Sequence, residues 1–265
     1  MAVIKGLEWT FNTVASEYDK WSPTYVQELY EDTFAYKKVE QSSNVLEIGI
    51  GTGQATVPIL ETGCTLIAVE LGDKLAEFTR QKFSGYKNFS VVNMPFQDFA
   101  CQNGSLDFIF SAGAFHWIPE EIGYTKVYNM LKSGGVFARF AKHPYYNKNG
   151  QECGQEKLHI AMQKVYSKYM SYSKPTPEYT EDKAKARADI AAKYGFTDID
   201  YRLYYRTHTY NSQDYISLIA TYSDHIVLEE SKRDGFYGGI KAAIDSHGGT
   251  ITLYDTIDLN LARKI

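Results

Sequence analysis

The 265-residue sequence has few cysteines, and Cys64, Cys101 and Cys153 lie far apart. Three scattered thiols are too few for a disulfide framework or a cysteine-based zinc site, so we expect them to be reduced. No apolar run approaches the ~18 residues that a bilayer-spanning helix needs. The first ten residues include Lys5 and Glu8 and do not resemble a secretory signal. These absences favour a cytoplasmic protein with no membrane partner.

The sequence also lacks a dense basic run. Lysine and arginine number 28 against 32 acidic residues, which gives a net charge of −4. The most basic stretch, 183–187 (Lys-Ala-Lys-Ala-Arg), is interpreted as a solvated helix face. We therefore do not expect nucleic acid as a partner. A hydrophobic fraction of 44% and a charged fraction of 23% are typical of a folded chain with a sizeable core.

Short apolar segments alternate with helical patterns over the first 140 residues. Strands are expected at 44–48, 65–70, 89–92, 106–110 and 136–140, and helices at 55–60, 73–83 and 119–131, with Gly63 as the C-cap of the first helix. Strand signal returns at 199–208, 250–254 and 259–262. This alternation predicts an α/β fold with a doubly wound, parallel sheet. Ligands of such sheets bind outside the carboxyl ends of the strands.

The remaining segments favour helices. Residues 1–40 have a helical pattern with Pro23 in a first turn, and residues 141–195 are polar and largely helical with a break at 174–177. We interpret 141–195 as a helical insertion within a single domain spanning 1–265, because no linker separates the parts. Tyrosines at helical spacing in this insertion, Tyr166, Tyr169 and Tyr172, favour packing inside it.

Three alternating glycines follow the first expected strand in the segment Glu47-Ile-Gly49-Ile-Gly51-Thr-Gly53. Glycine permits a sharp turn and lets a ligand approach the backbone. One alternative is a tight turn without a ligand, but its position in the first βα unit favours binding. The dinucleotide pattern G-x-G-x-x-G fails in both frames, at Gln54 and at Thr56, and no P-loop lysine follows. A ligand without a phosphate therefore fits better.

Two further segments lie where strands end. Glu70 ends the second expected strand, and a carboxylate there can accept both hydroxyls of a ribose. The alternative is an exposed strand-end acid. After the third strand, Phe96-Gln97-Asp98-Phe99 offers an apolar residue, an amide and a carboxylate for an adenine, although an ordinary loop is equally compatible.

With these residues identified, the chain resembles the class I S-adenosylmethionine-dependent methyltransferases, in particular the small-molecule branch with ubiquinone/menaquinone-type and trans-aconitate-type enzymes. The resemblance rests on 45–53, Glu70, 97–99, 105–111, 115–118 and 131–135. It departs from the family at Ser22, where many relatives have arginine, and at Pro95, where many have an acid.

The resemblance implies a Rossmann-like, seven-stranded sheet, with the C-terminal segment as an antiparallel strand inserted between the fifth and sixth. It also implies S-adenosyl-L-methionine as cofactor, an N-terminal lid over residues 1–40 and a cap formed by 141–195 over the site. The implied cofactor-binding residues are Phe11, Tyr18, Glu47, Gly49, Gly51, Gly53, Glu70, Leu71, Gln97, Asp98, Phe99 and Ser111.

The expected reaction is methyl transfer to a small-molecule acceptor by in-line displacement, which depends mainly on positioning. His116 follows the fourth strand and is the candidate general base, although it could simply pack the pocket wall together with Trp117. His143 and Tyr145 are candidates for lining the acceptor pocket with His116 and Trp117. Two alternatives stay open: a non-catalytic protein that binds the cofactor, and an NAD-type oxidoreductase.

Overall fold

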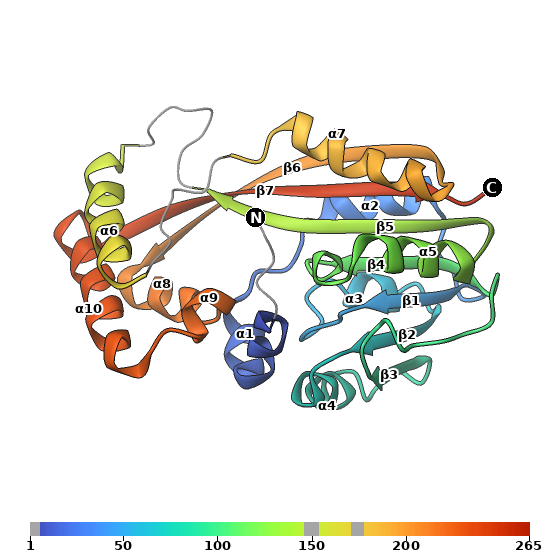
Figure 1. Cartoon of the computed structure of the whole chain (residues 1–265), viewed down its shortest axis with the longest axis horizontal. Coiled ribbons are helices and arrows are strands. Elements are labelled where there is room, and N and C mark those ends of the chain that lie inside the picture. The colour runs from blue at the N-terminus through green and yellow to red at the C-terminus, as the bar shows by residue number, and fades with distance from the viewer. Residues whose placement is uncertain (1–5, 146–153, 171–177) are drawn as a thin grey trace. The chain divides into compact units, whose positions relative to one another are not determined.

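The computed structural model describes residues 6–145, 154–170 and 178–265. The chain divides into two compact units (Figure 1). The first comprises 1–142, 180–204 and 257–265, and the second comprises 143–179 and 205–256. Three of the four boundaries fall inside long strands, β5 (Leu131–Tyr145), β6 (Thr197–Asn211) and β7 (Thr250–Arg263), and the fourth lies just before helix α7 (Glu181–Asp189). Residues 180–195, expected in the insertion, belong to the first unit.

A seven-stranded sheet has the order β3-β2-β1-β4-β5-β7-β6. Its other strands are β1 (Asn44–Ile48), β2 (Thr65–Glu70), β3 (Phe89–Asn93) and β4 (Leu106–Ala112). The pairs from β3 to β5 are parallel. Strand β7 is antiparallel to β5. Just after β7 ends, Lys264 accepts from the Gly134 amide and donates from its own amide to the Gly135 carbonyl. The expected doubly wound sheet with an inserted antiparallel strand is confirmed.

Helices cover both faces of the sheet in the first unit. Val45, Phe108 and Phe110 face one layer of helices, α2 (Gln27–Tyr36) and α3 (Val57–Leu60), with α4 (Asp73–Lys82) beside them. Leu46, Ile109 and Phe137 face the other layer, α5 (Glu120–Met130) and the 3-10 helix η3 (Ile190–Tyr194). The central strands are apolar on both faces because both faces are covered. This leaves the carboxyl ends of β1, β2 and β4 as the edge where loops converge.

Local boundaries differ from expectation at several places. Strand β5, expected over 136–140, already begins at Leu131 and continues to Tyr145. Pro23 lies in the extended link between α1 (Ala15–Trp21) and α2, rather than in a first turn. Helix α3 has Glu61 as its C-cap, and Gly63 takes up a left-handed conformation two residues later. The C-terminal segment forms the single strand β7 instead of two strands, because the intervening Asp255 and Thr256 are buried and continue the strand.

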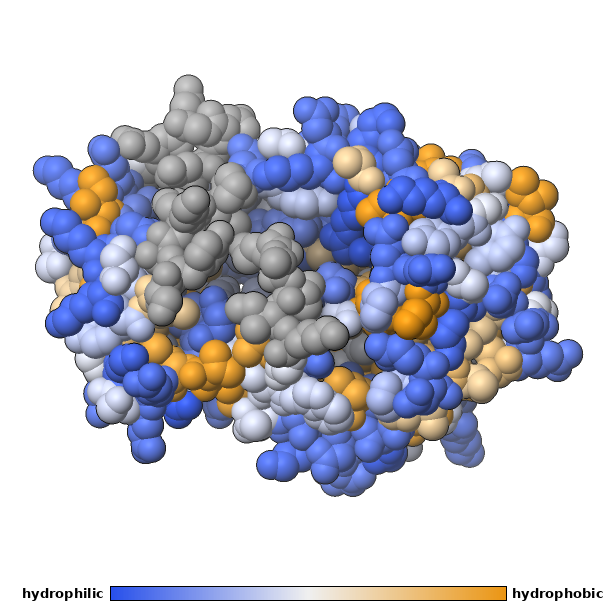
Figure 2. Space-filling model, in the orientation of Figure 1, coloured by the Kyte–Doolittle hydropathy of each residue, from blue (hydrophilic) through white to orange (hydrophobic). Residues whose placement is uncertain are grey.

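Helix α7 (Glu181–Asp189) carries the basic stretch that we expected to be solvated. Figure 2 shows a mostly hydrophilic surface over α5 and α7. Lys183 and Lys185 are exposed, but Arg187 is directed inward, with only 16% of its side chain accessible. The expectation of a solvated face is therefore wrong for Arg187, which forms an ion pair with the fully buried Asp258.

The second unit is held together by helices α6 (Glu156–Tyr169), α8 (Ser212–Ile219), α9 (Ser223–Ile226) and α10 (Glu230–Ser246). Tyr166 and Tyr169 pack edge-on against the buried Phe236, with centroid distances of 5.1 and 6.4 Å. This confirms the packing interpretation for both. Cys153, Tyr172 and the break at 174–177 lie outside the described residues. Within the described part of the chain, no helix has the length and apolarity needed to cross a membrane.

Candidate cofactor pocket

The glycine loop joins the end of β1 to the short helix α3 within the first unit. Gly49 donates from its amide to the Val69 carbonyl at 2.8 Å, which holds the loop against the end of β2. Gly51 has φ +59°, and a Cβ built there would meet no atom within 4 Å, so this position is open. Gly53 has φ +86°, and a Cβ there would lie 2.5 Å from the Phe83 ring. The loop therefore needs glycine for its conformation and for close packing.

The Glu70 carboxylate contacts the loop directly. Its Oε2 accepts from the Gly51 amide and its Oε1 accepts from the Gly72 amide, each at 2.9 Å. The side chain is 6% exposed, and burial raises the pKa of the carboxyl, while the backbone donors oppose that rise. Each oxygen keeps lone-pair capacity for another donor, as a ribose diol would require.

Glu47 lies behind the loop. It is buried on β1 and accepts a hydrogen bond from Thr56 Oγ1 at 2.8 Å. Burial raises the pKa of Glu47 to about 8, the Thr56 hydrogen bond opposes this, and the nearby charge of Glu70 adds to it. Near neutral pH the Glu47 carboxyl is therefore largely protonated and neutral.

A pocket of about 350 Å³ opens at this edge of the sheet in the first unit. This volume lies within the range typical of ligand sites. Of the residues expected at the site, eight line the pocket: Phe11, Tyr18, Gly49, Gly51, Glu70, Leu71, Gln97 and Trp117. The structure thus brings together expected residues from the N-terminal segment and from the ends of four strands.

Six expected residues of the first unit lie outside the lining. Glu47 and Gly53 are buried behind the loop, as described above. Phe99 belongs to the core under α5, and Asp98 is exposed. Ser111 is buried and donates from Oγ to the Ile48 carbonyl at 2.8 Å, which ties the ends of β4 and β1 together. Met94, Pro95 and Phe96, next to Gln97, form that wall of the pocket instead.

His116 is the sixth. It is exposed in the 3-10 helix η2 (Phe115–Trp117), with its ring 4.7 Å from the Trp117 ring centroid. The two remaining expected residues belong to the second unit. His143 stacks on Tyr179 at 3.6 Å, and Tyr145 is buried beside Tyr254. Trp117 is therefore the expected acceptor-site residue that lines the pocket.

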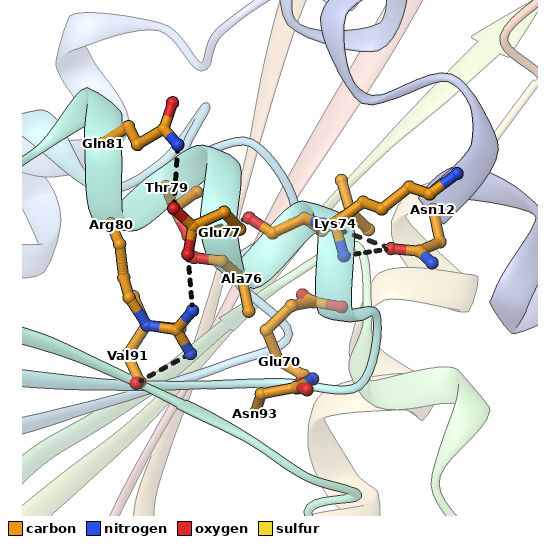
Figure 3. A network of polar contacts seen from close by, with 11 residues as sticks. Asn12, Glu70, Lys74, Ala76, Glu77, Thr79, Arg80, Gln81, Val91 and Asn93 are labelled. Atoms are coloured by element: carbon orange, nitrogen blue, oxygen red, sulfur yellow. Dashed lines mark hydrogen bonds and ion pairs between the residues drawn. The ribbon is translucent and has the colours of Figure 1, made fainter.

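The N-terminal segment, made of η1 (Leu7–Thr13) and α1, is fastened to helix α4. Figure 3 shows Asn12 at the first turn of α4, where its Oδ1 accepts from the Lys74 and Leu75 amides at 2.8 and 3.2 Å. Its Nδ2 donates to Asp73 Oδ1 at 2.7 Å. Asn12 thus caps a helix that begins 61 residues later. Sequence reasoning missed this contact because capping residues normally precede their own helix.

Lys82 also connects α1 to the rest of the first unit. Lys82 Nζ, at the end of α4, donates to Asp19 at 2.5 Å and to the Thr52 carbonyl of the glycine loop at 2.9 Å. Phe11 and Tyr18 pack edge-on at 5.3 Å on the pocket side of this segment. Burial raises the pKa of the Tyr18 phenol, so it stays protonated at neutral pH.

Lys142 and Tyr25 also line the pocket and were not among the expected site residues. Lys142, near the end of β5, donates from Nζ to Ser22 Oγ at 3.1 Å and to the Pro23 carbonyl at 2.5 Å. It also lies 5.2 Å from the Tyr25 ring centroid. The available signal was the position of Lys142 directly after a buried strand, at the carboxyl edge where ligands bind.

Comparisons with known proteins agree with this geometry. Residues 45–135 match the family model described as a methyltransferase domain. An uncharacterized methyltransferase of Bacillus mycoides is 28% identical over 172 residues, which cover 57% of this chain and 80% of that protein. Similar proteins of Bacillus cereus and Bacillus anthracis align at the same identity. These matches support a methyltransferase, and they leave the expected small-molecule branch untested.

Solved structures share the fold at low identity. Phosphoethanolamine N-methyltransferase 2 of Haemonchus contortus, in complex with phosphomonomethylethanolamine and S-adenosylhomocysteine, superposes with a TM-score of 0.57 at 15% identity. The alignment covers 100% of this chain and 61% of that longer protein. The [4+2]-cyclase SpnF superposes with a TM-score of 0.55 at 11% identity, covering 98% and 94%. The shared fold therefore does not by itself name a reaction.

Proposed function

We propose that this protein is an S-adenosylmethionine-dependent methyltransferase that acts on a small-molecule acceptor. One observation carries the proposal: Gly51 is open to the pocket, and its amide donates a hydrogen bond to Glu70. The Glu70 carboxylate can still accept further hydrogen bonds. A carboxylate at the end of β2 suits a ribose diol, and the absence of a phosphate-binding loop suits a nucleoside linked to an amino acid. The methyltransferase-domain match over 45–135 supports it.

The residues present fit this cofactor. Met94, Pro95 and Phe96 offer an apolar wall for a base, and Gln97 adds an amide. Tyr18 and Phe11 supply rings from the N-terminal segment, where aromatic faces can attract a sulfonium. The cofactor supplies an activated methyl group, so the chain's own residues need only position the reactants and exclude water.

The roles proposed for the acceptor side rest on residues adjacent to the pocket lining. His116, next to the pocket-lining Trp117, is proposed as general base. His143 and Tyr145 are proposed to line the acceptor site, and the helical insertion is proposed to cap it. Chain continuity supports this, because His143 directly follows the pocket-lining Lys142.

Calorimetry tests the cofactor assignment. S-adenosylhomocysteine and S-adenosylmethionine should bind the wild-type protein, and NAD should not. Glu70→Gln should weaken binding roughly 10- to 100-fold, because charge-assisted hydrogen bonds are worth about 1.5–3 kcal/mol. Glu77→Gln, on the exposed face of α4, is the matched control and should bind like wild type.

Transfer is tested separately with a labelled methyl group in a metabolite extract. Label in a small molecule would support the enzyme. Cofactor binding without transfer would favour a non-catalytic binding protein instead. Tight NAD binding, or unchanged affinity in Glu70→Gln, would refute the cofactor assignment itself.

A further inference from the structure

A second set of buried polar side chains lies in the first unit, on the face of the sheet covered by α5 and η3. Arg139 on β5 and Asp258 and Asn260 on β7 alternate with residues of the opposite face. They are 7%, 0% and 5% exposed. Arg187 approaches the set from α7. We call these four residues the arginine cluster.

The arginine cluster carries an excess positive charge. Arg187 Nη1 donates to both oxygens of Asp258, at 2.9 and 3.0 Å, so the one carboxylate is already paired. Arg139 donates from Nη1 to the Tyr124 hydroxyl, which carries no charge. Its guanidinium lies 4.8 Å from the Phe115 ring and 5.4 Å from the Tyr124 ring. A buried cation is costly unless it meets a counter-charge.

Several polar atoms of the cluster have no partner. Within the described part of the chain, Arg139 Nε is buried without a hydrogen bond, as are Nδ2 and Oδ1 of Asn260. Buried polar atoms of native proteins nearly always find partners. Two donors and one amide acceptor are thus left without a partner among the residues that the structure describes. Burial and the charge of Arg187 lower the pKa of Arg139, while Tyr124 and the charge of Asp258 oppose that shift.

The cluster borders the pocket. Arg139 on β5 lies opposite Ser111 on β4. The next residue of β4, Ala112, lines the pocket. Phe115, which covers Arg139, lies between the pocket-lining Ala114 and Trp117. The pKa of the pocket-lining Tyr25, raised mainly by burial, also responds to the charges of Asp258 and Arg187.

This position is on the β5 side of the pocket, separated from Glu70 on β2 by β1 and β4. We infer that Arg139 and Asn260 bind a carboxylate carried by the methyl acceptor. The inference rests on the proposed function and names the chemistry of its substrate. A carboxylate is an acceptor-only group that suits a guanidinium and an amide N–H. Glu70 at the end of β2 would then face the cofactor, and Arg139 on β5 would face the acceptor.

Formate is a probe small enough to test the site before any acceptor is known. Its effect on the thermal midpoint is measured with and without S-adenosylhomocysteine, against formamide as the neutral analogue and sodium chloride at equal ionic strength. We expect saturable stabilisation by formate alone. Arg139→Met should abolish it, and Arg139→Lys should retain part of it. Arg202→Met, which removes an exposed arginine of the same unit, should leave it unchanged.

Asn260→Leu separates binding from a purely structural role. If the Asn260 amide only binds a ligand, the ligand-free Asn260→Leu protein should have the same thermal midpoint as wild type or a higher one. The reason is that the substitution removes two buried polar atoms that have no partner. The same variant should lose the formate response. Acceptors found by labelled transfer should carry a carboxylate, and kcat/KM for them should fall at least about tenfold in Asn260→Leu.

Three results would overturn the inference: no formate response, an equal response to formamide or chloride, or an unchanged formate response in both Arg139→Met and Asn260→Leu. The proposed function fails on a different measurement, the absence of S-adenosylhomocysteine binding by calorimetry. Asn260→Leu should leave that binding unchanged, so the two failures can be told apart.

Discussion

The buried Glu47 carboxyl should make folding stability depend on pH. Its pKa is about 8 in the folded chain, against 4.5 as the reference for an exposed glutamate, and burial is the main cause. Between these values the folded state holds a proton that the unfolded state has released. The free energy of unfolding therefore falls as pH rises through this window. The native state is favoured most below pH 4.5, as far as this group is concerned.

The size of the effect follows from the width of the window. Each pH unit within the window is worth about 1.4 kcal/mol, so a loss on the order of 2–3 kcal/mol is expected between pH 5 and pH 7. Glu70 also has a raised pKa and acts in the same direction. Only the difference between wild type and Glu47→Gln isolates Glu47. The glutamine keeps an oxygen that can accept from Thr56 and does not titrate.

Urea unfolding of the cofactor-free protein at pH 5, 6, 7 and 8 measures this difference, provided that the m-value stays constant. Stability of Glu47→Gln should fall less steeply than that of wild type, and the two curves should converge or cross toward pH 8. Glu61→Gln, on the exposed turn after α3, controls for the loss of one carboxyl from the chain. Parallel curves for wild type and Glu47→Gln would show that the carboxyl is ionised in the folded state and would refute the reasoning.

Three shorter predictions concern the loop, the lid and the base. Gly53→Ala should destabilise the fold by about 1–3 kcal/mol, because the new Cβ would clash with the Phe83 ring and the backbone φ at this position is positive. The denaturant midpoint measures this loss, and an unchanged midpoint would contradict the prediction. Asn12→Ala removes the cap of α4, which is worth about 1 kcal/mol. The variant should therefore release S-adenosylhomocysteine faster than wild type in stopped-flow measurements. Equal release rates would mean that the N-terminal segment does not retain the cofactor. His116→Ala should lower turnover at saturating acceptor with cofactor affinity nearly unchanged; unaltered turnover would remove His116 from the mechanism.

Local patterns in the sequence were sufficient for the first βαβ units. The apolar runs of β1 and β2 and the glycines at 49, 51 and 53 predicted the strand boundaries and the turn, and the structure confirms both. The reason is that hydrophobic periodicity and glycine conformation act over a few neighbouring residues. Glu70 followed from the same logic, because a residue that ends a parallel strand must face the loop edge.

Contacts between distant segments were decided by the tertiary structure alone. Arg187 looked like part of a solvated face until β7 placed Asp258, 71 residues later, beneath it. Asn12 caps α4 from 61 residues upstream, and the second unit gathers 143–179 with 205–256. Such pairings depend on where the sheet order brings strands and helices together. No local window of sequence contains that information, because the partners become neighbours only when the chain has folded.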